Sequence, residues 1–435
     1  MTTATPPQSS RPAPTMSGGA FETLRERGFL YQCSDEAGLA QALARGPVTY
    51  YVGFDPTAPS LHIGHLLPVM AMAHLQRAGH KPIALVGGGT TMVGDPTGRT
   101  SARPILTREE IEANAIRIRG QLAHFLDLSA GQGFLVDNAD WLLPLNYIAF
   151  LRDYGRHFSV NEMLRAEAYR ARLETGLSFL EFNYMLLQAY DFLEAFRRHG
   201  CTVQLGGSDQ WSNILAGADL IRRVEGATAF ALTTPLLLTQ SGEKMGKTAG
   251  GERVWLDRSE TSPYAYYQFW VNCDDADVER LLRFFTYLAL DEIRDLVSTT
   301  GEGLRKAKRR LAFEATALLH GGADAEAARD AAQALFGGAD GGQVSLEALA
   351  RAGSIPAVPL DGNRLEAGIG ILDLLVLAGL AESKGAARRL VEGGGATVNE
   401  VRATMTTTVG RGDLHDGVLI VRAGKKRHVR LAVNP

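Results

Sequence analysis

Short apolar runs alternate with longer amphipathic segments over roughly the first half of the chain. The apolar runs predict strands at 49–54, 82–86, 134–136, 202–205 and 231–238, each followed by a polar or glycine-rich turn. Ser60 is the expected cap of a helix that runs to about Gly79. Strands that alternate with helices in this way predict a parallel sheet wrapped by helices, with its ligands at the carboxyl ends of the strands.

The rest of the chain has a different pattern of hydrophobic and polar residues. Residues 261 to about 336 have a helical pattern throughout, and glycines and prolines then indicate a linker. A small domain follows that mixes a helix pair with short Val-rich strands, whereas the Pro/Ser/Thr/Ala-rich start predicts a disordered tail. The predicted scheme is a tail at 1–19, an α/β domain at 20–255, an all-helical domain at 256–340, a linker at 341–366 and a small α+β domain at 367–435.

The amino-acid composition excludes only a few classes of protein. The 45 Lys and Arg against 48 Asp and Glu give a net charge of -3, which argues against a protein basic over its whole surface. Cys33, Cys201 and Cys273 stand far apart, so no metal spacing or disulfide framework is implied. No apolar run reaches the ~18 residues of a membrane span. We expect a cytoplasmic protein without a membrane segment.

The most informative motif lies between the first predicted strand and its helix. His62 and His65 stand three apart at a helix start, beside backbone N–H groups that favour a phosphate. Gly64 lacks a side chain, so a flat base could lie against the backbone there, and Thr57 precedes it in the loop. This pattern is suited to a nucleoside triphosphate. Two exposed helix histidines are the alternative interpretation.

A second motif follows about 180 residues later. Lys244, Lys247 and Thr248 lie in a Gly-rich segment directly after an apolar strand. Cations on a loop that closes late would stabilise charge on a departing pyrophosphate. When this segment is taken alone, a solvated turn is the better explanation.

Polar residues also follow the later strands and one helix face. Tyr184, Gln188 and Asp191 obey i, i+4, i+7 spacing and share one face of a helix, which by itself fits a solvated stripe. The run 206–210 after a strand fits either a ligand turn or a simple cap. The glycines at 87–89 lack dinucleotide spacing and predict a tight turn at the floor of the same cleft.

Taken together, the two motifs resemble the signature sequences of class I aminoacyl-tRNA synthetases. Further segments narrow the resemblance to the bacterial-type tyrosyl-tRNA synthetases. They are Tyr-Val-Gly-Phe-Asp-Pro-Thr at 51–57, Gly-Asp-Pro-Thr-Gly-Arg at 94–99, Phe-Ser-Val-Asn at 158–161, Tyr-Met-Leu-Leu-Gln-Ala-Tyr-Asp at 184–191 and Gln-Leu-Gly-Gly-Ser-Asp-Gln-Trp at 204–211. The similarity runs from about Phe21 to the C-terminus.

The resemblance implies a Rossmann-like catalytic domain that joins L-tyrosine to ATP and passes it to tRNA(Tyr). It implies catalytic roles for Thr57, His62, His65, Lys244, Lys247 and Thr248. It implies ATP contacts from Gly53, Asp55, Gly64, Arg99, Arg103, Asp209 and Lys247. It implies tyrosine contacts from Tyr51 and Asp191 at the phenol, Tyr184 and Gln188 at the ammonium group with Asp95 nearby, and Gln210 at the carboxylate. Mg²⁺ is expected with the ATP, although no carboxylate cluster marks a dedicated metal site.

Three positions depart from the family pattern. Arg99 replaces a lysine, which keeps the charge but changes its geometry. Gly246 replaces a frequent serine and removes a hydroxyl, and Val52 stands where a cysteine is familiar. None of these positions belongs to the predicted amino-acid pocket.

The predicted RNA-facing parts lie toward the C-terminus. Residues 305–310 include five Lys and Arg residues. They form either a solvated helix face or a contact with RNA phosphates. Residues 366–435 carry ten Lys and Arg against seven Asp and Glu, and they resemble a small RNA-binding domain of a ribosomal small-subunit protein. Lys384, Arg388 and Arg389, supported by Lys425, Lys426 and Arg427, are the expected tRNA contacts. A homodimer through the helical face after the sheet is expected by resemblance.

Three alternatives stay open at this point. A tryptophanyl enzyme shares the fold and both motifs, but it would not need Tyr51 and Asp191 placed for a phenol. A small-molecule adenylyltransferase would lack the lysine loop and the RNA domain. A non-catalytic RNA-binding protein would have no reason to keep both triphosphate motifs.

Overall fold

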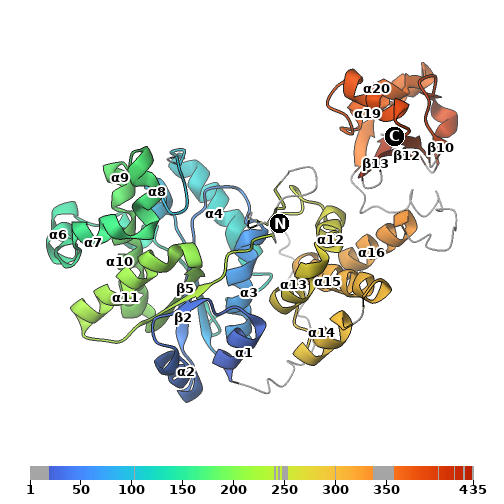
Figure 1. Ribbon diagram of the computed structural model, residues 1–435. Helices are drawn as coiled ribbons and strands as arrows, with labels where there is room; N and C mark the ends of the chain where they lie inside the picture. The colour runs from blue at the N-terminus through green and yellow to red at the C-terminus, as the bar shows by residue number, and fades with distance from the viewer. Residues whose placement is uncertain are drawn as a thin grey trace. The chain divides into compact units, whose positions relative to one another are not determined.

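The computed structural model describes residues 19–101, 103–239, 242, 245–246, 253–298, 300–336, 357–399, 401–415, 417–424 and 427–433 (Figure 1). Their contacts divide the chain into two compact units. The first is Met1–Asp257 with Asp274–Leu304, and the second is Arg258–Cys273 with Arg305–Pro435.

A six-stranded sheet forms the centre of the first unit. Its strands are β1 Gln32–Cys33, β2 Thr49–Phe54, β3 Lys81–Val86, β4 Phe134–Asp137, β5 Cys201–Gly207 and β6 Phe230–Thr234, in the order β1-β6-β5-β2-β3-β4. All neighbours are parallel except β1, which pairs antiparallel with β6. All five predicted strands are present, and β2 has the predicted bounds, but β6 ends at Thr234 and not at Leu238.

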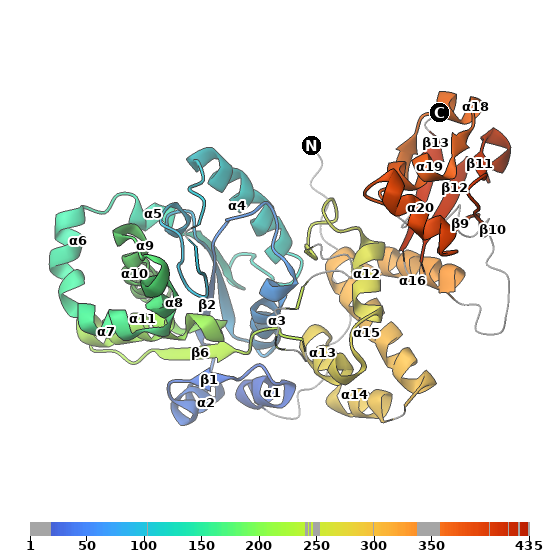
Figure 2. The same cartoon turned by 45° about the horizontal axis from the view of Figure 1, so that its top comes forward.

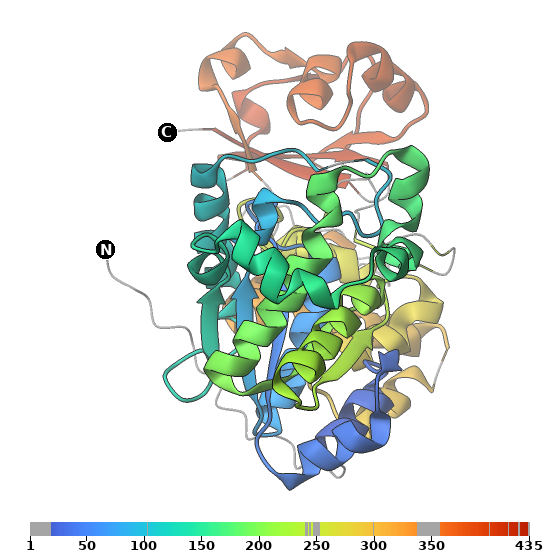
Figure 3. The ribbon, with the colours of Figure 1, turned by 90° about the vertical axis from the view of Figure 1, so that its left-hand side faces the viewer.

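Helices cover both faces of this sheet, as the prediction of a Rossmann-like α/β domain requires (Figures 2 and 3). They are α1 Ala20–Arg27, α2 Glu36–Arg45, α3 Ile63–Arg77, α4 Arg108–Leu122, α5 Ala139–Leu142, α6 Tyr147–Asp153, α7 Val160–Arg165, α8 Glu167–Thr175, α9 Phe179–Phe182, α10 Tyr184–His199 and α11 Trp211–Glu225. The chain passes from β2 through α3 to β3 in one direction along the sheet, and from β5 through α11 to β6 in the other direction. Because such crossovers are right-handed, α3 and α11 lie on opposite faces of the sheet. The carboxyl ends of β2 and β5 are therefore the point where the strand order reverses, where α/β sheets bind ligands.

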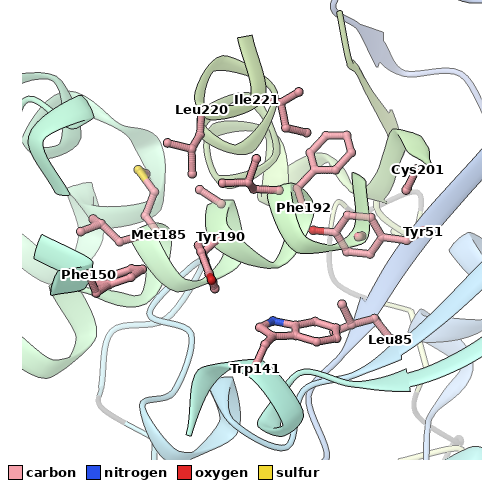
Figure 4. Packing of buried hydrophobic residues seen from close by; sticks show 14 of the residues in the cluster. Tyr51, Leu85, Trp141, Phe150, Met185, Tyr190, Phe192, Cys201, Leu220 and Ile221 are labelled. Atoms are coloured by element: carbon pink, nitrogen blue, oxygen red, sulfur yellow. The ribbon is translucent and has the colours of Figure 1, made fainter. Parts of the chain in front are cut away.

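The core between the sheet and α10 is apolar and aromatic (Figure 4). Tyr51 of β2 is buried, and its ring meets that of Phe192 on α10 edge-on, with 5.4 Å between centroids. Ala189, Phe192 and Leu193 are fully buried on the face of α10 that packs here. Gly200 ends α10 in the left-handed conformation, where a glycine is favoured. The side chains of α10 that point to the ligand end of the sheet are thereby held by a packed core.

The first turn of α3 differs from the sequence prediction. Its N-cap is His62, whereas Ser60 was expected to cap the helix. The Ser60 hydroxyl donates to the Leu61 carbonyl and accepts hydrogen bonds from the Gln121 side chain and the Asp257 backbone. Ser60 therefore joins the loop before α3 to two distant segments and has no part in capping.

The helical segment after the sheet is confirmed as helical, with α12 Pro263–Val271, α13 Val278–Phe285, α14 Leu290–Val297, α15 Glu302–His320 and α16 Gly322–Phe336. Helices α13 and α14 belong to the first unit. The buried Arg27 guanidinium at the end of α1 donates to the carbonyls of Arg283, Thr286 and Leu288 and so fixes them there.

In the second unit, α12 packs against α16, and Tyr266, Trp270, Leu311 and Thr316 are buried.

The C-terminal module has its own core and a five-stranded sheet in the order β10-β9-β12-β13-β7. Its elements are β7 Ala357–Leu360, α18 Gly362–Glu366, β8 Ile369–Gly370, α19 Ile371–Leu377, α20 Lys384–Glu392, β9 Ala396–Val398, β10 Val401–Arg402, β11 Thr408–Val409, β12 Val418–Ala423 and β13 Arg427–Val433. The predicted helix pair and Val-rich strands are α19, α20, β9 and β12. Since β7 pairs with β13, the module includes Ala357–Leu360, which the sequence placed in a linker.

None of the helices in the described part of the chain is long and apolar enough to cross a membrane.

Candidate functional site

One cavity of about 440 Å³ opens at the carboxyl ends of β2 and β5. The structure brings together in its lining every predicted catalytic, ATP and tyrosine residue that it describes. These are Tyr51, Gly53, Asp55, Thr57, His62, Gly64, His65, Asp95, Arg99, Arg103, Tyr184, Gln188, Asp191, Asp209 and Gln210. Lys244, Lys247 and Thr248 lie outside the described residues.

Asp191 lines the predicted amino-acid pocket from α10. It is buried, with Trp141 Nε1 donating to Oδ1 at 2.8 Å and Asn138 Nδ2 donating to Oδ2 at 2.9 Å. Burial raises the pKa of Asp191 to about 8, although the hydrogen bonds from Asn138 and Trp141 lower it. The solvated-stripe interpretation of this helix face is therefore wrong for Asp191 and for the buried Tyr184.

The Tyr51 hydroxyl is buried and has no hydrogen-bond partner among the described residues. A buried hydroxyl without a partner costs about 1–3 kcal/mol, so its presence needs an explanation. Burial, followed by the nearby charge of Asp191, raises the pKa of Tyr51 well above its usual value, and the hydroxyl stays protonated. A polar ligand group between Tyr51 and Asp191 would satisfy it.

Oxygen atoms converge on the next part of the cavity. Tyr184 donates its hydroxyl hydrogen to Asp55 Oδ2 at 2.8 Å, so toward the cavity this oxygen acts as an acceptor. Asp95 Oδ2 accepts from Gln210 Nε2 at 2.8 Å, and Gln188 Oε1 accepts from the buried Asn213 at 3.2 Å. A cluster of acceptor oxygens with two carboxylates suits an ammonium group.

Asp55 lies deeper than its predicted role as an ATP contact suggests. Its Oδ1 accepts from the Thr90 hydroxyl at 2.7 Å while Oδ2 accepts from Tyr184. Burial raises the pKa of Asp55 to about 6, the two hydroxyl bonds lower it, and the charge of Asp95 raises it. The Asp55 carboxylate therefore orients the Tyr184 side chain, in addition to its predicted contact with the nucleotide.

The twin histidines are held by reciprocal caps. His62 Nδ1 accepts from the Gly64 N–H at 3.0 Å, and His65 Nδ1 accepts from the His62 N–H at 3.2 Å. An imidazole whose Nδ1 accepts carries its proton on Nε2, so each ring offers one N–H donor. Burial, then the charges of His62, Arg253 and Arg103, lower the pKa of His65 well below its usual value.

This geometry changes the expected phosphate contact at α3. The N–H groups of Ile63, Gly64 and His65 already donate to Val254 O, His62 Nδ1 and His62 O. The sequence suggested backbone N–H groups as phosphate donors, but these three are occupied. A donor to an anion at this helix start would therefore come from an imidazole Nε2–H group, with the helix dipole in support.

The structure gives a further reason for a glycine at position 64, which the sequence did not indicate. A Cβ there would lie 2.9 Å from Cε1 of the His62 ring, so any side chain would displace the capping histidine. Gly246 is explained similarly, because its φ is +129° and a Cβ would lie 2.9 Å from the Ile63 side chain. A serine at position 246 would be strained in this chain.

The described residues within and after the predicted lysine loop are connected to the first motif by hydrogen bonds. Met245 N donates to Leu237 O at 2.8 Å, and Val254 N donates to Gly246 O at 2.9 Å. Val254 O in turn accepts from Ile63 N at 3.2 Å, and Trp255 bridges to His62. The described residues of the second motif and the segment after it therefore lie beside the helix start that carries the first motif.

Arg99 and Arg103 reach the cavity from the loop after β3. Arg103 Nε donates to the Asp95 carbonyl at 3.1 Å. Burial, then the charge of Arg103, lower the pKa of Arg99. The loop is anchored from outside by Arg172, which is paired with Glu181 at 3.1 Å and donates to the Thr100 carbonyl at 2.9 Å.

The predicted RNA-contacting residues of the C-terminal module are partly described. Lys384, Arg388 and Arg389 are exposed on α20, where Ser383 caps the helix and Lys384 pairs with Asp373 at 2.6 Å. Lys425 and Lys426 lie outside the described residues, as does the Arg427 side chain.

Sequence reasoning missed several residues of the site. Asn138 is fully buried and links the glycine turn to Asp191, since its Oδ1 accepts from Gly89 N and its Nδ2 donates to Thr90 and Asp191. Gln204 is buried with its Oε1 unpaired among the described residues and lines the cavity beside Tyr51. Trp141 and Arg253 were also missed. A polar residue directly after a strand end, as Asn138 is, was the one available signal.

Comparisons with known proteins decide the family. The family described as tRNA synthetases class I (W and Y) matches residues 43–337, and a tyrosine–tRNA ligase SYY-like C-terminal domain matches 352–431. The tyrosine–tRNA ligase of Acetivibrio thermocellus is 50% identical over 412 residues, covering 94% of this chain and 98% of that protein. The chain belongs to the tyrosine–tRNA ligases.

Other relatives agree with this assignment. The tyrosine–tRNA ligase of Clostridium tetani is 49% identical over 419 residues, covering 96% of this chain and all of that protein. Among solved structures, a C-terminally truncated mitochondrial tyrosyl-tRNA synthetase of Aspergillus nidulans is 32% identical, covers 73% of this chain and 94% of its own, and gives a TM-score of 0.66. A tryptophanyl-tRNA synthetase of Encephalitozoon cuniculi, 13% identical with a TM-score of 0.52, shares the fold alone. Of the alternatives left open by the sequence, the tyrosyl family is the one that the whole chain matches.

Proposed function

We propose that this tyrosine–tRNA ligase activates L-tyrosine with ATP to give tyrosyl-adenylate and pyrophosphate, and then transfers the tyrosyl group to the 3′ end of tRNA(Tyr). The observation that carries the proposal is the cavity in which Asp191 and a buried Tyr51 hydroxyl, without a partner among the described residues, lie with the twin-histidine helix start. The reaction is assigned to the cytoplasm, where tRNA is charged for protein synthesis.

The amino-acid half of the site is proposed to recognise tyrosine at both ends. The phenol would lie between the Tyr51 hydroxyl and Asp191, and Gln204 would line the ring. The ammonium group would meet the oxygens of Tyr184, Gln188 and Asp95, while one N–H of Gln210 is left for the carboxylate. The carboxylate is thereby turned toward the nucleotide half.

The nucleotide half is proposed to align and neutralise the triphosphate. His62 and His65 would donate Nε2–H groups to it, with Thr57, Arg99 and Arg103 nearby and Gly53, Gly64 and Asp209 beside the nucleoside. Lys244, Lys247 and Thr248 would meet the departing pyrophosphate. Mg²⁺ would arrive with ATP; among the described residues no group of three or more His, Cys, Asp or Glu is placed to hold a metal.

The first step needs no side-chain nucleophile, because the substrate supplies it. A tyrosine carboxylate oxygen attacks the α-phosphorus, a P–O bond to the β-phosphate breaks, and pyrophosphate leaves with the electron pair. In the second step a terminal ribose hydroxyl of the tRNA attacks the tyrosyl carbonyl and loses its proton, the C–O bond to the phosphate breaks, and AMP leaves with the electron pair. Catalysis consists of alignment and of donors that meet the charge as it develops.

The helical and C-terminal parts are proposed to hold the tRNA. Lys384, Arg388 and Arg389 are exposed together on α20, and ten Lys and Arg against seven Asp and Glu make residues 366–435 net positive. Lys425, Lys426 and Arg427 extend this charge in the sequence. Contacts of this kind bind phosphates and weaken with salt.

A homodimer is proposed on a surface other than the one predicted from sequence. Large apolar side chains are exposed on α6 to α9, and they include Tyr147, Ile148, Val160, Leu164, Leu173, Phe179 and Leu180. Phe179 is 69% and Ile148 70% exposed. Apolar surface of this kind is typical of subunit interfaces, and sedimentation velocity measures whether two copies associate.

Amino-acid-dependent exchange of labelled pyrophosphate into ATP tests the activity. Exchange with tyrosine and not with tryptophan or phenylalanine is the expected result. Exchange with tryptophan would assign the tryptophanyl specificity, and an absence of exchange with any amino acid would exclude the proposed activation step.

Tyrosine affinity should depend on pH through Asp191. If the phenol donates to the carboxylate, only the ionised form binds, and burial raises the pKa of Asp191 to about 8. The apparent Kd should therefore fall on the order of 10-fold between pH 6.5 and 8 as the carboxylate ionises. Equilibrium dialysis measures this, and Asp191→Asn should abolish the dependence. A Kd that rises with pH would mean that the protonated acid is the binding form.

Tyr51→Phe should separate stability from recognition. The variant removes a buried hydroxyl that has no partner in the described structure, so the free energy of unfolding should stay the same or rise by about 1 kcal/mol. The loss of one neutral hydrogen bond to the phenol should lower kcat/KM for tyrosine about 3- to 10-fold. Chemical denaturation and exchange kinetics measure the two effects. A destabilised protein would show that the hydroxyl has a structural role.

A further inference from the structure

Arg253 lies in the cavity but is not among the residues that the signature motifs account for. It begins the segment 253–257, which runs antiparallel to residues 61–63 through Ile63 N to Val254 O at 3.2 Å and Leu256 N to Leu61 O at 2.8 Å. Val254 and Leu256 are buried on one side of this segment. Arg253 and Trp255 alternate with them and line the cavity on the other side.

Trp255 is the described side chain that positions the Arg253 guanidinium. Its carbon lies 5.1 Å from the centre of the Trp255 ring, and no carboxylate among the described residues pairs with it. Stacking on an indole holds the plane of a guanidinium and leaves its N–H groups available. The side chain is exposed, so packing does not require it.

Arg253 adds a third guanidinium to a cavity that already holds two. Its charge contributes to the lowered pKa of both His65 and Arg99, which places it near the helix start and the loop after β3. Three cationic side chains in one cavity repel each other unless an anion joins them. A guanidinium binds phosphate oxygens through two parallel N–H groups, which a lysine cannot do.

We propose that Arg253 is a further catalytic residue of this chain, which binds the β- and γ-phosphates of ATP and holds the departing pyrophosphate. This inference rests on the proposed function. Trp255 acts as the positioning residue that holds the guanidinium plane. Arg253 approaches the phosphates from the segment after the lysine loop, while Arg99 and Arg103 approach them from the loop after β3. The chain thereby surrounds the leaving group with cations from two different elements.

The test compares Arg253→Ala, Arg253→Lys and the matched control Arg45→Ala, which alters an exposed arginine at the end of α2. Arg253→Ala should lower kcat/KM for ATP and for pyrophosphate in the tyrosine-dependent exchange by about 10- to 100-fold. Arg253→Lys should recover part of the loss, because it restores the charge without the two-pronged geometry. Arg45→Ala should match the unmodified protein.

Two further measurements separate this role from others. The Kd for tyrosine without ATP and the unfolding temperature should not change in Arg253→Ala; a change in both would show a structural role and overturn the proposal. Normal exchange with loss of tRNA charging alone would assign Arg253 to the tRNA and also overturn it. If the unmodified protein shows no tyrosine-dependent exchange, the proposed function fails independently of Arg253.

Discussion

Asp191→Asn is expected to lower kcat/KM for tyrosine in pyrophosphate exchange by about 10²- to 10³-fold while leaving the KM for ATP nearly unchanged. In the proposed complex, the substitution removes the carboxylate that accepts from the phenol. It also turns an amide NH₂ toward one of two donors, Trp141 Nε1 or Asn138 Nδ2, which now donate to the two carboxylate oxygens. A buried donor that faces a donor costs about 1–3 kcal/mol, in addition to the lost charge-assisted bond.

The same substitution should reduce the preference for tyrosine over phenylalanine. A site built to bond a hydroxyl rejects the analogue that lacks it, because its own polar groups would stay unpaired, and tyrosyl-tRNA synthetases are a known case of this rule. Exchange kinetics with both amino acids measure the ratio. Asp219→Asn, on the exposed surface of α11, is the control. An equal loss for tyrosine and phenylalanine would show that Asp191 supports the fold and does not read the phenol.

The residues of this pocket show how far the sequence could predict the site. Tyr184, Gln188 and Asp191 have helical spacing, so their common face followed from the sequence. The sequence did not show whether that face is exposed to solvent or buried, because this depends on how β4 and α5 pack over α10. Asn138 and Trp141 reach Asp191 from about 50 residues away in the chain, and no local pattern marks such a contact.

The fold was predictable to a greater extent for a physical reason. Parallel strands are buried on both faces, so they are continuous apolar runs that end at glycines and polar residues, and β2 was predicted with its observed bounds. Capping was less predictable, since Ser60 and His62 can both accept from a backbone N–H. Tertiary hydrogen bonds from Gln121 and Asp257 engage the Ser60 hydroxyl and leave the cap to His62.

The position of His62 as a cap makes its proposed catalytic role separable from its structural one. His62 Nδ1 accepts from Gly64 N, whereas its proposed role toward the triphosphate uses the other ring nitrogen, Nε2. Asparagine is among the best N-cap residues, so His62→Asn keeps the cap but loses the distant donor. We expect it to slow adenylate formation by about 10²-fold, the usual effect of removing one donor to developing charge. The free energy of unfolding should stay within about 0.5 kcal/mol of the unmodified protein.

His62→Ala provides the comparison, because it removes the donor and the cap together. It should slow adenylate formation as much as His62→Asn does and should also destabilise the protein by about 1 kcal/mol. Single-turnover kinetics with ATP and tyrosine measure the rate, and equilibrium dialysis measures the tyrosine Kd, which neither variant should change. The charge that Nε2–H meets grows as the P–O bond breaks, so the loss belongs to the transition state. An adenylate rate within about 3-fold of normal in His62→Asn would mean that His62 serves only to begin α3.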